Sequence, residues 1–80
     1  MDIAVEISMY PLSKDYLAPI QDFIDRLHAN EKLVVQTNTM STQVLGDYDE
    51  VWNALREAMR ISLQAGPKAV FVTKFLPRDA

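Results

Sequence analysis

Few side chains in this sequence are of the types that perform covalent or metal chemistry. The chain has no cysteine and a single histidine, His28. A nucleophile–base pair or a typical metal cluster needs several such groups, so the sequence predicts neither. Asp47, Asp49 and Glu50 could together bind a hard cation, but helix capping accounts for two of the three. We therefore expect no metal site and no cofactor, and the two glycines stand at predicted helix ends, not in a phosphate-binding loop.

Two further candidates for catalysis have simpler interpretations. Glu6 could act as a general base, but a lone carboxylate on a sheet more often accepts hydrogen bonds or pairs with a cation such as Lys74. His28 falls near the end of a predicted helix, where a cation interacts favourably with the helix C-terminus. We therefore expect a protein that binds a ligand and does not catalyse a reaction.

Length and charge narrow the class of protein. Eighty residues suffice for one domain, expected to span 1–80, and the 49% of apolar residues argues against disorder. The net charge of −3, with no basic stripe, argues against a nucleic-acid partner. No apolar run approaches the roughly 20 residues of a membrane span, and the absence of cysteine is typical of a cytoplasmic protein.

The periodicity of the apolar residues predicts six elements in the order β-α-β-β-α-β. Strand-like alternation covers 2–10, with Ile3, Val5, Ile7 and Met9 on one side. Helical spacing follows from about residue 16 to residue 30, with Pro19 in the first turn and Arg26 on the solvent side. The next extended segments are 33–39 and 41–45. The second helix begins at the Asp47–Glu50 capping box and ends at Gly66, a predicted left-handed cap, before a strand over 69–76.

This order predicts an α+β fold of the ferredoxin-like type. Right-handed crossovers place the four strands in an antiparallel sheet of order 4-1-3-2, with both helices on one face. Trp52 in the second helix is predicted to lie in the core. The parity of the fourth strand is ambiguous, because Phe71 and Phe75 are as apolar as their neighbours; these two side chains are assigned to the helix side of the sheet.

Strand parity also predicts which residues occupy the open face of the sheet. Its apolar members are Val34, Leu45, Val70 and Val72, which a monomer would not normally leave exposed. Its polar members come from all four strands and are Glu6, Ser8, Gln36, Asn38, Ser41, Gln43 and Lys74. Apolar surface with a few convergent polar groups is what a small-molecule site requires, although a half-exposed sheet also carries polar residues for solubility alone.

Two segments of the chain resemble a known family. The run Val5-Glu-Ile-Ser-Met-Tyr-Pro-Leu and the run from Thr37 through Met40-Ser-Thr-Gln-Val-Leu-Gly-Asp-Tyr-Asp-Glu to Val51 are similar to motifs of the YkoF-like family, which binds thiamine or hydroxymethylpyrimidine. The resemblance extends over essentially the whole chain, in the same order of elements.

The resemblance implies a ferredoxin-like domain that binds a thiamine-type pyrimidine beside its sheet. It also implies pairing through the open sheet, here as a homodimer or homotetramer, because this chain holds one copy of the domain. The family motifs correspond to Ser8 and Tyr10 in the first strand and to Asn38, Ser41 and Thr42 in the hairpin. Parity places Thr42 on the helix side, away from the other four.

Chemical complementarity adds residues to this candidate site. An aminopyrimidine has an exocyclic amine, from which the Glu6 carboxylate could accept a hydrogen bond. It also has ring nitrogens, to which Ser8, Asn38 and Ser41 could donate hydrogen bonds. Tyr10 and Lys74 are expected nearby. The sequence leaves two alternatives: an oligomerisation or regulatory module that senses another metabolite, and a small dimeric enzyme on the same architecture.

Overall fold

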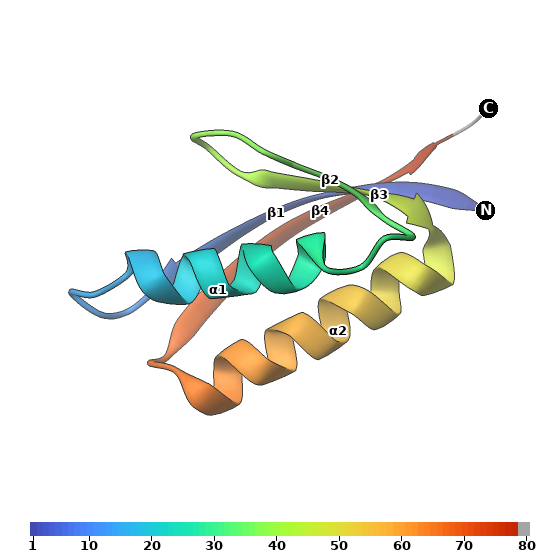
Figure 1. Ribbon diagram of the computed structural model, residues 1–80. Helices are drawn as coiled ribbons and strands as arrows, with labels where there is room; N and C mark the ends of the chain where they lie inside the picture. The colour runs from blue at the N-terminus through green and yellow to red at the C-terminus, as the bar shows by residue number, and fades with distance from the viewer. Residues whose placement is uncertain (79–80) are drawn as a thin grey trace.

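The computed structural model describes residues 1–78, so the expected domain of 1–80 extends two residues beyond the described part. The elements are β1 (Asp2–Pro11), α1 (Leu17–His28), β2 (Val34–Thr37), β3 (Thr42–Asp47), α2 (Tyr48–Ala65) and β4 (Ala69–Arg78). The four strands form one antiparallel sheet in the order β2-β3-β1-β4, and both helices lie on the same face of it (Figure 1). The predicted ferredoxin-like fold and strand order are confirmed.

The core lies between the sheet and the helices, and strand alternation creates it. Ile3, Val5, Ile7 and Met9 of β1 are all buried, whereas the intervening residues are not. They pack with Val44 of β3 and with buried side chains of both helices, among them Phe23, Leu27, Val51 and Leu55. Full burial of each such side chain contributes about 1.5–3 kcal/mol, which explains why the period-two and helical patterns predict the fold so directly.

The two phenylalanines of β4 face the helices, the side to which they were assigned although the parity of this strand was ambiguous. The ring of Phe71 packs on that of Phe23, with 5.1 Å between centroids. The ring of Phe75 is stacked on Trp52 at 4.6 Å, but Trp52 remains 40% exposed. Trp52 therefore lies on the flank of the core and not within it.

Both helix starts are close to the predicted positions. Pro19 lies in the first turn of α1, where its missing N–H costs no hydrogen bond. Asp47 caps α2 by accepting hydrogen bonds from the backbone N–H groups of Asp49 and Glu50. The second half of the predicted capping box is wrong, because the Glu50 carboxylate instead pairs with Lys32 Nζ at 3.4 Å.

Three other local predictions are corrected by the structure. Gly66 is extended, with φ −115° and ψ −170°, so the end of α2 needs no left-handed residue. Arg26 is half-buried: its Nη2 donates to the Ala58 carbonyl oxygen at 3.3 Å and to Ser62 Oγ, which joins the two helices. β4 continues through Pro77 and Arg78, two residues beyond its predicted end.

No helix within residues 1–78 combines the length and the apolar character that crossing a membrane requires.

Candidate functional site

A pocket opens at the end of the sheet where β1 finishes. It has a volume of about 370 Å³ and lies between the last residues of β1, the first half of α1 and the turn that joins β2 to β3. Figure 1 shows the reason for this opening: the tip of the β2–β3 hairpin stands away from the first turns of α1. The lining residues are Ile7–Pro11, Tyr16, Ile20, Phe23, Ile24 and Thr37–Thr42.

The floor of the pocket is apolar because it is the edge of the core. Ile7 and Met9 reach it from β1, and Phe23 reaches it from α1; all three are almost completely buried. Tyr10 and Tyr16 also line the pocket but are about half exposed, at 53% and 51%. An apolar floor with aromatic rings at the mouth suits a flat heteroaromatic ligand.

Asn38 shapes the polar side of the pocket. Its Oδ1 accepts hydrogen bonds from the backbone N–H groups of Met40, at 2.8 Å, and Ser41, at 3.0 Å. The Asn38 N–H also donates to the Ser41 carbonyl oxygen at 3.0 Å, so the turn is held by three hydrogen bonds. This arrangement is a side-chain-stabilised turn, which asparagine favours. The carbonyl half of the Asn38 amide is thus committed to the turn, and its NH₂ group is the half available for a ligand.

Ser8 and Ser41 connect the turn to β1 on the open side of the sheet. The Ser8 hydroxyl donates to the Met40 carbonyl oxygen at 3.4 Å. The Ser41 hydroxyl donates to Glu6 Oε2 at 3.1 Å, and Glu6 Oε1 lies 3.5 Å from Lys74 Nζ. Glu6 and Lys74 are also register partners in the β1–β4 pair. These contacts form one polar chain from β4 through β1 to the hairpin turn.

Thr42 lies on the helix side of the sheet, as parity predicted, and is 4% exposed. Its Oγ1 is 3.1 Å from Oγ1 of Thr37, its register partner across the hairpin. Both threonines line the pocket. Thr42 therefore joins the other candidate residues, because the pocket wraps around the end of the sheet and does not lie on its open face alone.

The structure brings five of the seven candidate residues together around the pocket: Ser8, Tyr10, Asn38, Ser41 and Thr42. The other two, Glu6 and Lys74, do not line the pocket. Glu6 contacts the lining residue Ser41, and Lys74 pairs with Glu6. Sequence reasoning missed the contributions of α1 and of the hairpin tip, chiefly Tyr16, Ile20, Ile24 and Met40. The spacing of apolar residues did not mark these residues as part of a site, because Ile20 and Ile24 have the spacing of an ordinary core-facing helix.

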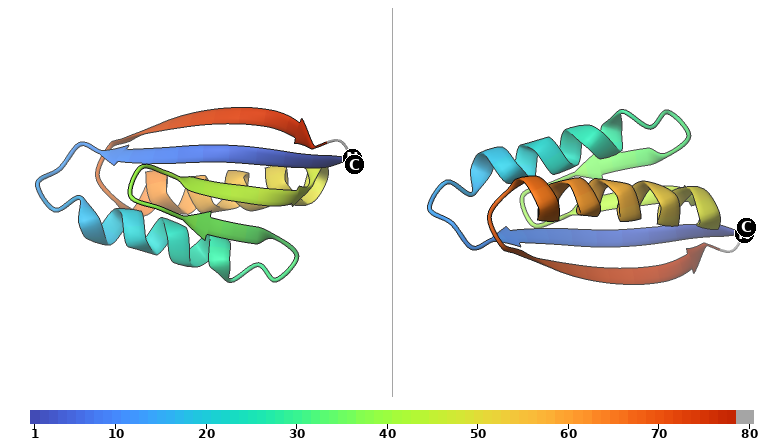
Figure 2. Two further views of the ribbon diagram at one scale, coloured as in Figure 1. Left: turned by 90° about the horizontal axis from the view of Figure 1, so that it is seen from above. Right: turned by 90° about the horizontal axis from the view of Figure 1, so that it is seen from below.

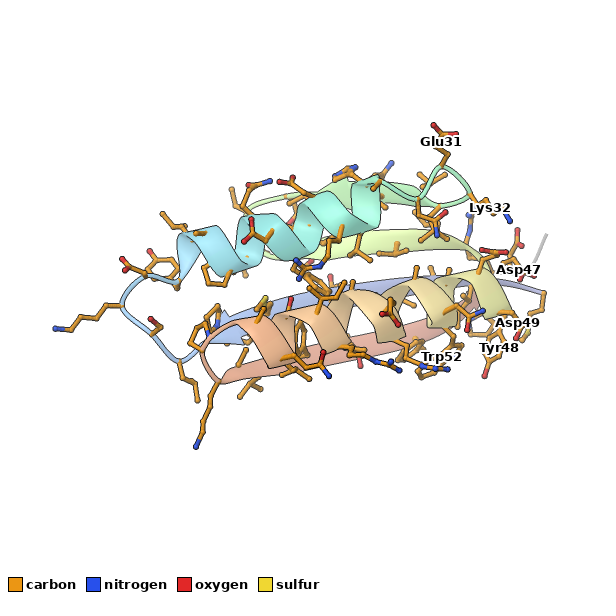
Figure 3. The ribbon with its side chains drawn as sticks, turned by 60° about the horizontal axis from the view of Figure 1, so that its bottom comes forward. Glu31, Lys32, Asp47, Tyr48, Asp49 and Trp52 are labelled. Carbon is orange, nitrogen blue, oxygen red and sulfur yellow. The ribbon has the colours of Figure 1, made fainter. Side chains whose placement is uncertain are left out.

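The lining of this pocket carries no carboxylate, imidazole, ammonium or guanidinium group. The chain's histidine, His28, is exposed at the last position of α1. Asp47 is engaged as the helix cap and Glu50 with Lys32, at the opposite end of β1 from the pocket (Figure 3). Across residues 1–78, no group of three or more His, Cys, Asp or Glu side chains is placed to hold a metal ion.

Solved structures with the same fold come from bacteria and archaea. A hypothetical protein from Methanocaldococcus jannaschii superposes with a TM-score of 0.83 at 28% identity, covering 98% of this chain and 81% of that one. A Streptococcus pneumoniae protein gives a TM-score of 0.90 at 21% identity, covering 99% and 89%. A Thermotoga maritima protein with a proposed role in thiamine biosynthesis or salvage gives 0.85 at 18% identity, covering 98% and 85%.

Sequence comparison gives the family. No curated protein sequence matches the chain. The family model described as the YKOF-related family matches residues 2–75, which include all six elements apart from the last residues of β4. The chain therefore belongs to the YKOF-related family.

Proposed function

We propose that this protein binds thiamine or its hydroxymethylpyrimidine half, without catalysis, in the pocket between α1 and the β2–β3 hairpin. The observation that carries the proposal is the lining of that pocket: an apolar floor, two tyrosines at the mouth and a ring of uncharged hydrogen-bonding groups. A role in thiamine biosynthesis or salvage, proposed for the Thermotoga maritima protein of the same fold, supports this choice of ligand.

The polar groups match an aminopyrimidine in number and kind. The Asn38 NH₂ group can donate to a ring nitrogen, since its carbonyl oxygen is already occupied by the turn. The hydroxyl groups of Thr37 and Thr42 form a pair in which either oxygen can donate or accept. A hydroxyl pair of this kind can serve the exocyclic amine or the hydroxymethyl group. The ring itself would stack against Tyr10 or Tyr16.

The uncharged lining also selects the form of the ligand. Phosphate recognition normally uses arginine or lysine side chains, and neither residue type lines the pocket. The unphosphorylated compounds are therefore the expected ligands. A cationic thiazolium would extend through the mouth toward a protein whose net charge is −3.

The same lining supports binding over catalysis. Proton transfer in enzymes is carried mostly by histidine, carboxylates and lysine placed against the substrate. The pocket has none of these, and Glu6, the nearest carboxylate in the polar chain, is bound to Ser41 and Lys74.

We further propose that the protein works in the cytoplasm as a homodimer or homotetramer, paired through the open face of the sheet. Val34, Val70 and Val72 are 55%, 48% and 50% exposed on that face, and Leu45 lies beside Val34 across the β2–β3 pair. Burying such a surface is favourable at roughly 25 cal/mol per Å² of apolar area.

Calorimetric titration tests the proposed ligand. We expect hydroxymethylpyrimidine and thiamine to bind with similar stoichiometry, and thiamine diphosphate to bind no more tightly than thiamine. A protein that binds none of these compounds at millimolar concentration would overturn the proposal. It would leave the alternative of an oligomerisation or regulatory module that senses a different metabolite.

A further inference from the structure

A second pocket lies between the two helices. It has a volume of about 260 Å³. Sites for drug-sized molecules typically have volumes of about 300–1,000 Å³, so this pocket suits a smaller molecule. Among residues 1–78, no residue lines both this pocket and the one between α1 and the β2–β3 hairpin. A ligand of the second pocket is therefore independent of the proposed pyrimidine site.

The direction of the helices explains where this pocket lies. α1 and α2 run in opposite directions, so the first turn of α1 is at the same end of the molecule as the last turn of α2 (Figure 2). Pro19 from that first turn and Ala65 from that last turn both line the pocket. Arg26 and Ser62, which also line it, are in contact further along the helix pair. The pocket thus follows the seam between the helices, from their adjoining ends to the contact of Arg26 with Ser62.

Arg26 contributes a half-buried positive charge to this pocket. Its Nη2 donates to the Ala58 carbonyl oxygen and to Ser62 Oγ, which are both uncharged. Its Nε is buried without a hydrogen-bond partner, and the ion pairs within residues 1–78 do not include Arg26. Taking a charge out of water is costly unless an opposite charge and hydrogen bonds replace the water. The contacts with α2 therefore use one nitrogen of Arg26 and leave its charge without an anion.

Ser62 provides a hydrogen-bond donor beside that charge. The residue is 7% exposed and lines the pocket. Its Oγ accepts a hydrogen bond from Arg26, so the hydrogen of the hydroxyl group remains available to donate. Carboxylates bind guanidinium groups through strong, charge-assisted hydrogen bonds. A carboxylate placed against Arg26 would therefore neutralise its charge and could also accept from Ser62.

Asp22 contributes a negative charge to the same pocket. It lies one turn before Arg26 on α1 and is exposed. A spacing of four residues on a helix favours an ion pair between aspartate and arginine. In the part of the chain that the structure describes this pair is not formed, because Arg26 is bound to α2 instead. The pocket thus contains one anionic and one cationic group that do not neutralise each other.

Much of the remaining lining is apolar. We call it the apolar wall, and it consists of Ala18, Pro19, Ile61, Ala65 and Pro67. Ile61 is the largest of these side chains and is 39% exposed. Covering such a surface with an aliphatic group is favourable, at roughly 25 cal/mol per Å² of apolar area. The wall therefore suits the aliphatic part of a ligand whose charged groups meet Arg26 and Asp22.

We propose that this pocket binds a free α-amino acid with a branched aliphatic side chain. The carboxylate of the ligand lies against Arg26 and Ser62, its ammonium group pairs with Asp22, and its side chain covers the apolar wall. The two charges select against simpler ligands. Asp22 repels a plain carboxylate, Arg26 repels a plain amine, and an uncharged molecule neutralises neither group. A ligand with both charges satisfies both residues.

Titration of the full chain with L-leucine, followed by NMR, tests the ligand. We expect saturable shifts at the backbone amides of Asp22, Ser62 and Ala65 and at the Nε–H of Arg26, while the amides of 37–42 stay unchanged. Isocaproate is leucine without its amine, and isoamylamine is leucine without its carboxylate. Each should bind at least about 10-fold more weakly than L-leucine, since each lacks one charged hydrogen bond. Equal binding of either compound, or no saturable shift with L-leucine at millimolar concentration, would overturn the proposal.

Substitution of Asp22 tests the location of the site with little risk to the fold, because this side chain is exposed. Asp22→Asn should weaken L-leucine binding by roughly 10–150-fold and should reduce the preference for L-leucine over isocaproate. Asp25→Asn is the matched control, because it removes the same charge from the same helix outside the pocket. It should bind L-leucine as the unaltered chain does. Unchanged affinity in Asp22→Asn, or an equal loss in Asp25→Asn, would contradict the site.

Discussion

The hydroxyl group of Ser41 donates a hydrogen bond to Glu6 Oε2 at 3.1 Å, which ties the β2–β3 turn to the central strand. Through this contact Glu6, which does not line the pocket, influences the position of a residue that does. We therefore assign Glu6 the role of positioning the turn.

Ser41→Ala and Glu6→Gln should reveal this role by different sizes of effect. Ser41→Ala removes the bond, and the loss of about 0.5–1.5 kcal/mol should weaken hydroxymethylpyrimidine binding by roughly 2–10-fold. Glu6→Gln keeps an acceptor for Ser41, so it should weaken binding less. Calorimetry on both variants measures the difference. If Glu6→Gln weakens binding far more than Ser41→Ala, Glu6 contacts the ligand itself.

Asn38 has two roles that can be separated by substitution. Asn38→Asp keeps an oxygen to accept from Met40 and Ser41 but removes the NH₂ donor. It should leave the melting temperature nearly unchanged and weaken binding of the neutral hydroxymethylpyrimidine by roughly 2–10-fold. Asn38→Ala, the comparison variant, should also destabilise the hairpin. Full affinity in the Asp variant would contradict a contact between the Asn38 amide and the ligand.

Asp47 should contribute measurably to stability as the cap of α2. Asp47→Ala frees the backbone N–H groups of Asp49 and Glu50 and should lower the free energy of unfolding by about 0.5–2 kcal/mol. Asp49→Ala removes another exposed acidic side chain from the same turn without removing the cap. Urea titrations in which both variants lose the same stability would show that capping is not the cause.

The open face of the sheet should control self-association. Val34 lies on β2, at the opposite border of the sheet from β4, and is 55% exposed. Val34→Lys places a charge in the expected face-to-face interface and should shift sedimentation toward a smaller species. Gln36→Lys, at the next position on the same face of β2, tests whether charge alone is responsible. An unchanged assembly in Val34→Lys would exclude this part of the face from the interface.

The fold was predictable because it depends on the periodicity of buried residues. Alternation in β1 placed Ile3, Val5, Ile7 and Met9 inward, and helical spacing placed Phe23 and Leu27 against them, as the structure confirms. The candidate site was predictable only in part. Ser8, Tyr10 and Asn38 were found from motif and parity, but the partners that α1 supplies depend on how far the hairpin tip stands from the helix, and no local pattern encodes that distance.

The predictions of local features were wrong where a side chain had a contact with a residue distant in sequence in place of a contact within its own helix or with solvent. Glu50 fits a capping box, yet Lys32, eighteen residues away, takes its carboxylate. Arg26 fits a solvent-facing position, yet the buried Ser62 and the Ala58 carbonyl group on α2 draw it between the helices. Such choices are decided by tertiary packing, which a single sequence does not display.

Chemical-shift mapping by NMR, with hydroxymethylpyrimidine as the probe, tests the central proposal most directly. We expect the largest changes at the backbone amides of Thr37–Thr42 and of Ile20, Phe23 and Ile24, which surround the pocket. Gln43, Val72 and Lys74 on the open face should change little. Saturable shifts confined to those open-face residues, with no change at the pocket amides, would contradict the proposed location of the site. The absence of any saturable shift would contradict pyrimidine binding itself.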